Sequence, residues 1–158
     1  KKILSSLNEA TKQVGLTLKF IIMITTRNRN EVENEIKEAL GLVPSFFKSI
    51  PERYLDSEWQ LFQALELGET LIPNKYKELM GVALHSETKC RYCILFHTEA
   101  AKLFGATDEE IQEAVHFSKM SVGWSVYING MQTDFDEFAK EFTKIGDYLK
   151  TKNLEHAN

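Results

Sequence analysis

Hydrophobic residues recur at helical spacing along most of the chain beyond residue 30. They return every three or four positions in successive runs, and no segment in this part of the sequence alternates apolar and polar residues with a period of two. Short polar stretches with glycine or proline separate the runs, and no internal repeat is visible. We therefore expect an all-α domain over residues 31–158. The expected helices cover about residues 30–40, 57–67, 73–85, 89–104 and 134–149. A further helix is expected from residue 107, with inward residues as far as Ser118, and the apolar stretch 123–131 suits close helix packing.

Start and stop signals locate the ends of the helix that carries the cysteines. Thr88 is the expected N-cap, because its hydroxyl can accept a hydrogen bond from an amide two or three residues later. Gly105 is suited to the left-handed conformation that ends many helices. Thr107 and Glu110 then form a capping box for the next helix. The sequence therefore predicts a helix that begins just before the cysteines and ends near Phe104.

Two further expectations concern the helices that come earlier. Asn30 and Glu33 resemble a capping box at the start of the first helix, and a later helix is expected to begin near Asp56 or Ser57. In the helix that follows Pro73, the apolar positions predict which face is buried. The side chains expected on that face are Tyr76, Leu79, Met80, Ala83 and Leu84.

Residues 1–30 differ from the rest of the chain because they follow no single hydrophobic period. The segment FIIMITT, residues 20–26, is rich in β-branched residues and is typical of a short strand. The apolar run at residues 16–24 is interrupted by Lys19 and is much shorter than the roughly 20 residues that a membrane helix needs. We expect an N-terminal arm or extension over residues 1–30, suited to packing on a partner subunit, and no membrane association.

Composition narrows the function classes. The 158 residues suit one ordinary globular domain, with 43% hydrophobic and 27% charged residues. A formal net charge of −4 without a dense basic cluster argues against nucleic acid as a partner. No secretion signal is recognisable, and two cysteines do not make a disulfide scaffold. We expect a cytoplasmic protein, and in a reducing cytoplasm a CxxC pair is more often catalytic or metal-binding than structural.

The two cysteines form the motif Cys90-Arg-Tyr-Cys93, and His97 follows four residues after the second cysteine. Three interpretations are open: a redox centre, part of a zinc site, or two inert buried thiols. A thioredoxin-type site is disfavoured because its CxxC follows a β-strand, whereas a helix is expected here. A structural zinc site wants four ligands, and only His97 and either His85 or His116 could supplement the two thiolates.

Helical geometry favours chemistry over inert packing. At about 100° per residue, Cys90, Cys93 and His97 lie within about 60° of one another on one helix face. Cys90 and Cys93 are close enough to bridge with modest adjustment, and His97 is one turn after Cys93. The helix N-terminus, with Lys89 and Arg91, would stabilise a thiolate most strongly at Cys90, whereas the imidazole would act on Cys93. Which sulfur attacks first is left open.

With Glu78 twelve residues before Cys90, this arrangement resembles the carboxymuconolactone decarboxylase superfamily, and most closely its alkylhydroperoxidase D-like branch. The segments ALGLVPSFFKSIPE, ELGETLIPNKYKELMGVA, LFHTEAAKLFGATDEEIQEAV and GWSVYINGMQ are also similar to members of this family. The resemblance covers about residues 32–145. It implies an alkylhydroperoxidase D-like helical bundle with the CxxC at the N-terminus of a central helix, assembled as a homo-oligomer, a trimer or a hexamer.

The resemblance also implies a thiol-dependent peroxidase or disulfide oxidoreductase in antioxidant defence. Cys90 and Cys93 would cycle between dithiol and disulfide, while Glu78 and His97, with water, would form a proton relay that deprotonates Cys93. The substrate would be a peroxide or a disulfide. An external thiol donor of the dihydrolipoyl type, or another reducing thiol protein, would then restore the dithiol. No bound cofactor and no metal are expected.

One position departs from the family pattern. The best-known alkylhydroperoxidase D proteins carry a second histidine where this chain has Tyr92, a possible site-lining residue that can donate a hydrogen bond but is a poor base. Two other functions therefore stay open: a decarboxylase-like lyase of the same fold, and a non-catalytic redox sensor. Glu87 is a weaker relay candidate than Glu78, and His85 and His116 are expected in packing or surface roles. Core or interface roles are expected for Trp124, Tyr127 and Asn129.

Overall fold

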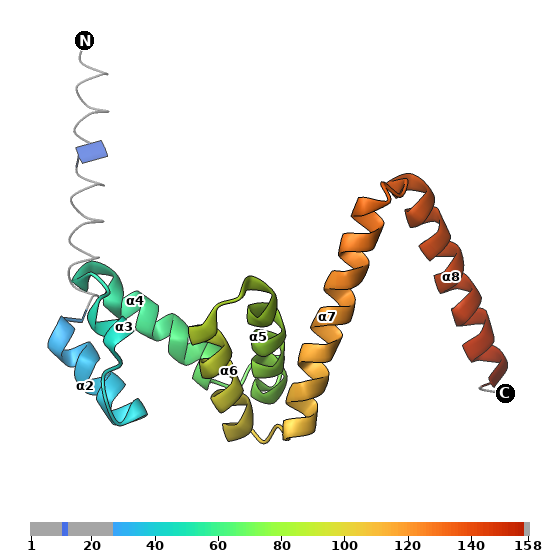
Figure 1. The fold of residues 1–158 in the computed structure, drawn as a ribbon. Helices are drawn as coiled ribbons and strands as arrows, with labels where there is room; N and C mark the ends of the chain where they lie inside the picture. The colour runs from blue at the N-terminus through green and yellow to red at the C-terminus, as the bar shows by residue number, and fades with distance from the viewer. Residues whose placement is uncertain (1–10, 13–26, 157–158) are drawn as a thin grey trace, which may run out of the picture. The chain divides into compact units, whose positions relative to one another are not determined.

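The computed structural model describes residues 11, 12 and 27–156, with side chains described as far as residue 152. Every regular element in this part of the chain is helical, and no strand occurs among the described residues (Figure 1). The all-α prediction is therefore confirmed. Most of the predicted arm at residues 1–30 lies outside the described residues, and so does the predicted strand at residues 20–26.

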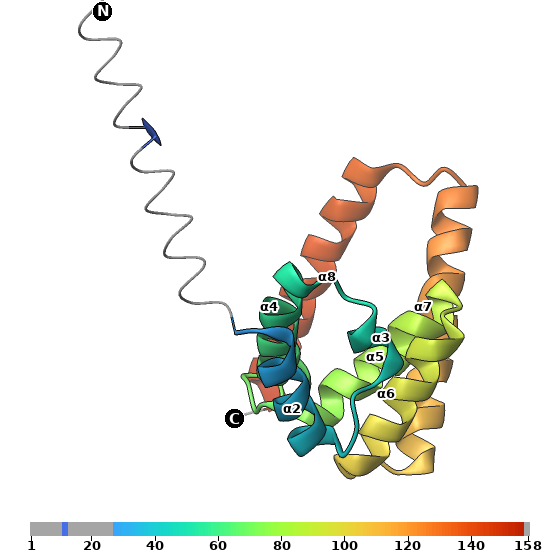
Figure 2. The same cartoon turned by 90° about the vertical axis from the view of Figure 1, so that its left-hand side faces the viewer.

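The chain divides after Ile72 into two units. Figures 1 and 2 show their helices in two orthogonal views. The first unit contains α2 (Arg29–Leu40), α3 (Ser45–Lys48), α4 (Glu52–Phe62) and a π-helical turn η1 (Gln63–Leu67). The second unit contains α5 (Asn74–Thr88), α6 (Arg91–Leu103), α7 (Asp108–Gly130) and α8 (Phe135–His156).

The core of the first unit forms around Trp59 of α4, which is fully buried. The ring of Phe47 meets the Trp59 ring edge-on at 5.6 Å between centroids, and Phe62 stacks on it at 5.8 Å. Such offset and edge-to-face contacts are the arrangements that aromatic rings prefer. Aliphatic side chains of α2 and α4 complete the cluster. These are Val32, Ile36 and Leu55.

Two predicted helix starts are wrong. The capping box of α2 is formed by Asn28 and Glu31, whose side chains each accept a hydrogen bond from the other's backbone N–H. Helix α4 begins at Glu52 directly after Pro51, one turn before the expected cap. Asp56 is not a cap because its carboxylate is used elsewhere, as the buried partner of an arginine.

That partner is Arg27, which donates to the Asp56 carboxylate from Nε at 2.9 Å and from a terminal guanidinium nitrogen at 2.7 Å. Asp56 is only 5% exposed, and Gln60 also donates to it. Burial raises the pKa of Asp56, but the hydrogen bonds from Arg27 and Gln60 outweigh it and leave the pKa below its ordinary value. The ionised form of Asp56 therefore stabilises the folded first unit.

In the second unit, α5 and α6 form a helical hairpin whose connection is only Lys89 and Cys90 (Figure 1). Lys89 adopts a left-handed conformation with φ of 58°, which reverses the chain direction. The carbonyl of His85 accepts hydrogen bonds from the backbone N–H groups of both Lys89 and Cys90. The last turn of α5 is thereby tied to the first residue of the CxxC motif.

The buried face of α5 differs from the expected one. Tyr76, Met80 and Leu84 are all exposed. The residues that are buried are Asn74, Glu78, Gly81 and Val82. Small and polar side chains occupy this face because α6 and α7 pack closely on α5, and a row of bulky apolar side chains would hold those helices apart.

Helix α7 begins with the predicted capping box of Thr107 and Glu110, which is confirmed. Ser118 donates a hydrogen bond at 2.9 Å to the carbonyl of Ala83, which ties α7 to α5. Helix α8 does not pack extensively on another described helix of its own unit. None of the helices in the described part of the chain combines the length and apolar character that crossing a membrane requires.

Replacing Asp56 with alanine should lower the free energy of unfolding by roughly 1–3 kcal/mol at neutral pH, since Arg27 loses its buried acceptor. Because the folded-state pKa of Asp56 is depressed, its contribution should be present above the ordinary value of 3.8 and disappear as the pH falls through the folded-state value. Urea unfolding of wild type and variant between pH 7 and pH 3 would check both effects. Glu33→Ala, which breaks a surface pair with Arg29, is the control and should change stability by less than about 0.5 kcal/mol. A wild-type-like Asp56→Ala would contradict the assignment.

Replacing Gly81 with alanine should disturb the contact between α5 and α6. A Cβ at this position would lie 2.5 Å from Cγ and Nδ1 of the His97 ring, so the ring or the whole of α6 must move. We expect a loss of roughly 1–3 kcal/mol in stability, measured by urea unfolding, and a changed NMR shift for the His97 ring.

Gly146→Ala in α8 is the matched control for this substitution. Its added Cβ meets no atom within 4 Å, so the change should raise stability by up to about 1 kcal/mol through helix propensity alone. If both glycine variants were equally stable and the His97 signal stayed in place, the close approach of α6 to Gly81 would be wrong.

Candidate functional site

The two cysteines lie at the start of α6 and are joined by a disulfide, with their Cα atoms 5.4 Å apart. Cys90 is the N-cap residue, and its sulfur accepts a hydrogen bond from the Cys93 backbone N–H at 3.3 Å. The expected cap, Thr88, is instead the last residue of α5. The prediction that the CxxC sits at the N-terminus of a helix is confirmed, although the residue that caps the helix is Cys90 itself.

This position gives the two sulfurs different surroundings. The first-turn amides of α6 face Cys90, so the helix dipole and the Cys93 N–H stabilise negative charge on the Cys90 sulfur when the pair is reduced. Lys89 and Arg91 add positive charge on either side in the sequence. Both cysteines are half-buried rather than sealed in the core. The arrangement therefore combines thiolate stabilisation with access, which are the two conditions for thiol–disulfide exchange.

Glu78 of α5 and His97 of α6 form a buried pair. The Nδ1 atom of His97 lies 2.7 Å from Oε2 of Glu78, and the two side chains are 15% and 1% exposed. When the Glu78 carboxylate is ionised it can only accept a hydrogen bond, so in that state Nδ1 would carry the proton and Nε2 of a neutral His97 would keep its lone pair. The carboxylate thus fixes the tautomer and orientation of the imidazole. Glu78 is not the solvated residue that its lysine-rich flanks would suggest.

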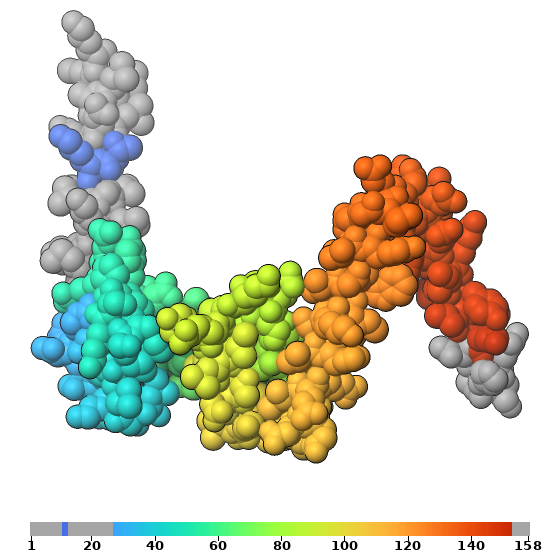
Figure 3. Space-filling model, viewed as in Figure 1, coloured from blue at the N-terminus to red at the C-terminus, as the bar shows by residue number. Residues whose placement is uncertain are grey.

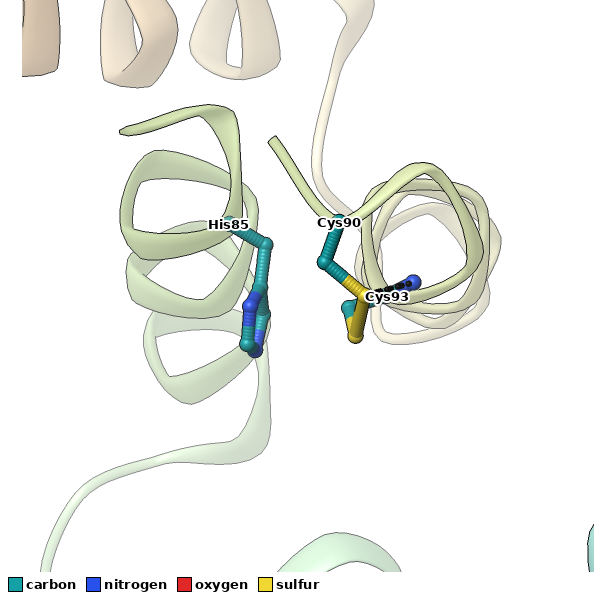
Figure 4. Close-up of side chains that lie close together, drawn as sticks. All are labelled: His85, Cys90 and Cys93. Atoms are coloured by element: carbon teal, nitrogen blue, oxygen red, sulfur yellow. Dashed lines mark hydrogen bonds between the residues drawn. A yellow bond between two sulfur atoms is a disulfide. The ribbon is translucent and has the colours of Figure 1, made fainter. Parts of the chain in front are cut away.

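His85 was expected in a packing or surface role, and otherwise considered only as one possible extra zinc ligand, but the structure places it at the cysteines. One of its ring nitrogens and the sulfurs of Cys90 and Cys93 all lie within 4.8 Å of one another, and Figure 4 shows the ring facing the sulfurs from α5. The His85 ring also stacks on the His97 ring, with centroids 5.1 Å apart and planes 8° from parallel. His85 is therefore neither a surface nor a simple packing residue.

No pattern in the sequence indicated this proximity. His85 precedes Cys90 by five residues. Within one continuous helix, side chains that contact each other are three or four residues apart, so this spacing does not predict a contact. It becomes close to the sulfurs because the left-handed Lys89 turns the chain back on itself between α5 and α6. A positive φ at a lysine is uncommon and is not recognisable from the residue type.

The remaining candidates do not gather with these side chains in the same way. Tyr92 is 77% exposed, and the Arg91 guanidinium lies 5.4 Å from the centre of its ring, so its site-lining role stays a prediction. His116 and Glu87 are exposed. Trp124 and Tyr127 of α7 are also exposed in the single chain.

A groove lies between the end of α5 and the middle of α7. Its volume is about 420 Å³, and it contains one lysine and one glutamate among small and apolar side chains. The two opposite charges give it no clear preference for an anionic ligand. The residues that line it are Ser86, Glu87, Val115, Ser118, Lys119, Val122 and Gly123.

Comparison with known proteins agrees with this geometry. The structure is similar to the crystal structure of the alkylhydroperoxidase AhpD core from Rhodospirillum rubrum, with a TM-score of 0.60, 21% sequence identity, and coverage of 68% of this chain and 82% of that one. This likeness shows that the fold is alkylhydroperoxidase D-like.

Among curated proteins, the chain is 30% identical over 61 residues to "Uncharacterized protein 4 in cox locus" of Paracoccus denitrificans. The match covers 39% of this chain and 55% of that protein, so the chain spans little more than half the length of this relative.

The family model for the carboxymuconolactone decarboxylase family matches residues 52–132, which is just over half of the chain. The matched region runs from α4 to the end of α7 and includes Glu78, His85, both cysteines and His97. Together with the shared fold, this match settles the family, and the chain belongs to the carboxymuconolactone decarboxylase family.

Proposed function

We propose that this chain is a thiol-dependent peroxidase or disulfide oxidoreductase of antioxidant defence that works by cycling Cys90 and Cys93 between dithiol and disulfide. The observation that carries the proposal is a bridged, half-buried CxxC at a helix N-terminus, with a ring nitrogen of His85 within 4.8 Å of both sulfurs. The His85 ring stacks in turn on His97, which pairs with the buried Glu78. A structural disulfide would need neither the buried Glu78 nor an oriented imidazole. Enzymes that activate thiols need both a stabilised thiolate and a nearby base.

The proposed reaction with a peroxide has two steps. A cysteine thiolate attacks one peroxide oxygen, the O–O bond breaks, and the leaving alkoxide takes a proton, so that one alcohol and one sulfenic acid form. The second thiol then attacks the sulfenic sulfur, which forms the Cys90–Cys93 disulfide and releases water. An external dithiol of the dihydrolipoyl type reduces this disulfide by exchange and is itself oxidised. The chain needs no bound cofactor for these steps.

Glu78 and His97 are proposed as the proton relay. With Nδ1 held by Glu78, the other ring nitrogen of His97 is free to take the Cys93 proton, directly or through a water molecule. The imidazolium that forms would be stabilised by the buried carboxylate. Tyr92 cannot replace the second base found in close relatives. His85, which does lie beside the sulfurs, adds an imidazole from the other helix.

The lyase alternative is less well supported by the surroundings of the site. A carboxylated ring substrate would favour a pocket with an excess of cationic side chains, whereas the groove beside α5 pairs Lys119 with Glu87. The redox-sensor alternative keeps the same dithiol but predicts no useful turnover. The cytoplasmic location remains a prediction.

The enzymatic proposal predicts a defined pattern of variant activities. With a dihydrolipoyl-type dithiol as donor, wild type should consume a peroxide catalytically, and Cys90→Ser and Cys93→Ser should each lose at least about a hundredfold in rate. Glu78→Gln should lose about ten- to a hundredfold, because a neutral amide holds His97 in position less strongly and cannot balance its charge. Following peroxide loss over time with each purified variant would measure these effects.

Glu87→Gln is the matched control for the carboxylate. Glu87 lies on the same helix but is exposed, so its removal should leave the peroxide rate unchanged. Equal rates for wild type and both cysteine variants would rule out the redox function. If wild type formed the disulfide reversibly without consuming peroxide, the sensor would be the better assignment. Ring-opening of a carboxylated lactone by a cysteine-free variant would support the lyase.

We also propose that the chain assembles as a homo-oligomer, a trimer or a hexamer, through α7 and α8. Exposed apolar side chains follow both helices, and contiguous patches of this kind usually mark an interaction surface. In Figure 3, α7 and α8 are the orange and red parts of the space-filling view. The large apolar side chains exposed there are Met120, Trp124, Val126, Tyr127, Met131, Phe135, Phe142, Ile145, Tyr148 and Leu149.

Sedimentation should therefore give a mass three or six times that of one chain. Trp124→Glu and Phe142→Glu should shift the population toward smaller species, because a charge in a buried apolar contact is costly. Lys37→Glu on α2, an exposed position in the first unit, should leave the assembly intact. A monomeric wild type at micromolar concentration would disprove the assembly.

A further inference from the structure

We propose that, in the dithiol form, His85, Cys90 and Cys93 bind a thiophilic divalent cation of the zinc type, with a fourth position open. The proposal concerns the reduced chain alone and does not require that it turn over a peroxide. The sequence offered His97 and either His85 or His116 as ligands beside the two cysteines, without deciding among them. The structure brings His85 of the neighbouring helix to the two sulfurs.

The distances suit such a site. One ring nitrogen of His85 and both sulfurs lie within 4.8 Å of one another. Tetrahedral zinc with bonds of about 2.3 Å to sulfur and about 2.0 Å to nitrogen requires its ligand atoms to be roughly 3.5–3.8 Å apart. The disulfide holds the two sulfurs closer than this. Reduction by an external dithiol, which adds two electrons and two protons, breaks the S–S bond and lets side-chain rotation bring the sulfurs to the required separation.

The CxxC spacing and its helix position also favour a metal. Two cysteines separated by two residues are the usual first half of a zinc site. Cys90 and Cys93 must lose their thiol protons to bind, and the Cys93 N–H together with the α6 N-terminus stabilises the resulting charge on Cys90. Two thiolates and one neutral imidazole balance the charge of a divalent cation. Binding therefore releases two protons and leaves the site electrically neutral.

His85 already makes contacts that restrain it. Its Nδ1 lies 3.2 Å from the hydroxyl oxygen of Thr88, and in the tautomer in which Nδ1 donates to that oxygen, Nε2 keeps the lone pair that a metal needs. One face of the ring stacks on His97, which Glu78 holds in turn. The His85 backbone is fixed as well, because its carbonyl accepts from Lys89 and Cys90. The His85 side chain would therefore lose little conformational freedom when it binds the metal.

Three protein ligands that are half-buried leave the fourth tetrahedral position accessible to water or to an external thiol. The site would be open and reversible rather than a permanent structural one. It would exist only when the cysteines are reduced, since the disulfide sulfurs carry no thiolate to donate. Metal binding and oxidation of the dithiol therefore exclude each other, and this regulatory consequence is the only part that rests on the proposed redox function.

The test uses Co²⁺ as a spectroscopic probe on the full chain, reduced with a phosphine and kept free of oxygen. Wild type should bind one Co²⁺ per chain with a thiolate-to-cobalt charge-transfer band in the near ultraviolet, and Zn²⁺ should displace it. His85→Ala should weaken binding at least tenfold. His116→Ala, which removes an exposed histidine of α7, is the matched control and should bind as wild type does.

His85→Gln gives a second test if the alanine variant does not fold, because glutamine keeps the size of the side chain but is a poor zinc ligand. The oxidised wild type should show no charge-transfer band. Wild-type affinity in either His85 variant, or no band in the reduced wild type, would overturn the site. These readouts are independent of peroxide consumption, so a chain that binds Co²⁺ but consumes no peroxide would contradict only the proposed enzyme function.

Discussion

The buried hydrogen bond between Glu78 and His97 is the interaction on which the site depends. It joins α5 to α6, and it exists only because Gly81 lets the imidazole come within contact distance of the α5 backbone. A carboxylate that is 1% exposed would be costly without a partner. The pair therefore holds the two helices in one relative position while it also restrains the imidazole ring.

The α5–α6 turn adds a second constraint. Lys89 in the left-handed region keeps the connection to two residues, so the last turn of α5 lies directly beside the first turn of α6. The two histidine rings stack across this hairpin, and the sulfurs lie against His85. A carboxylate, two imidazoles and two sulfurs thus come from 20 consecutive residues, Glu78 to His97. Neither the Glu78–His97 hydrogen bond nor the stacking of His85 on His97 involves a cysteine sulfur, so both contacts are compatible with the proposed change of redox state.

Several features could be predicted from local chemistry. The hydrophobic period indicated an all-α fold, the Thr107–Glu110 box marked the start of α7, and the CxxC was expected at a helix start. Other predictions were wrong for identifiable reasons. Asp56 was expected to cap a helix but is buried against Arg27, and Tyr76, Met80 and Leu84 were expected to be buried but are exposed. Apolar periodicity shows which face of a helix can be buried, but not against which neighbour it packs.

By itself, the sequence determined the helices, the family resemblance through Glu78, Cys90, Cys93 and His97, and the presence of thiols near a helix N-terminus. Those properties depend on residue type and on short spacings along the chain, and both can be read directly from the sequence. Only the tertiary structure decided that Glu78 is buried on His97 and that His85 stands beside the sulfurs. Both facts follow from the close approach of α5 and α6 and from the left-handed conformation of Lys89. Residue spacing along the chain predicts neither the distance between the two helices nor that backbone conformation.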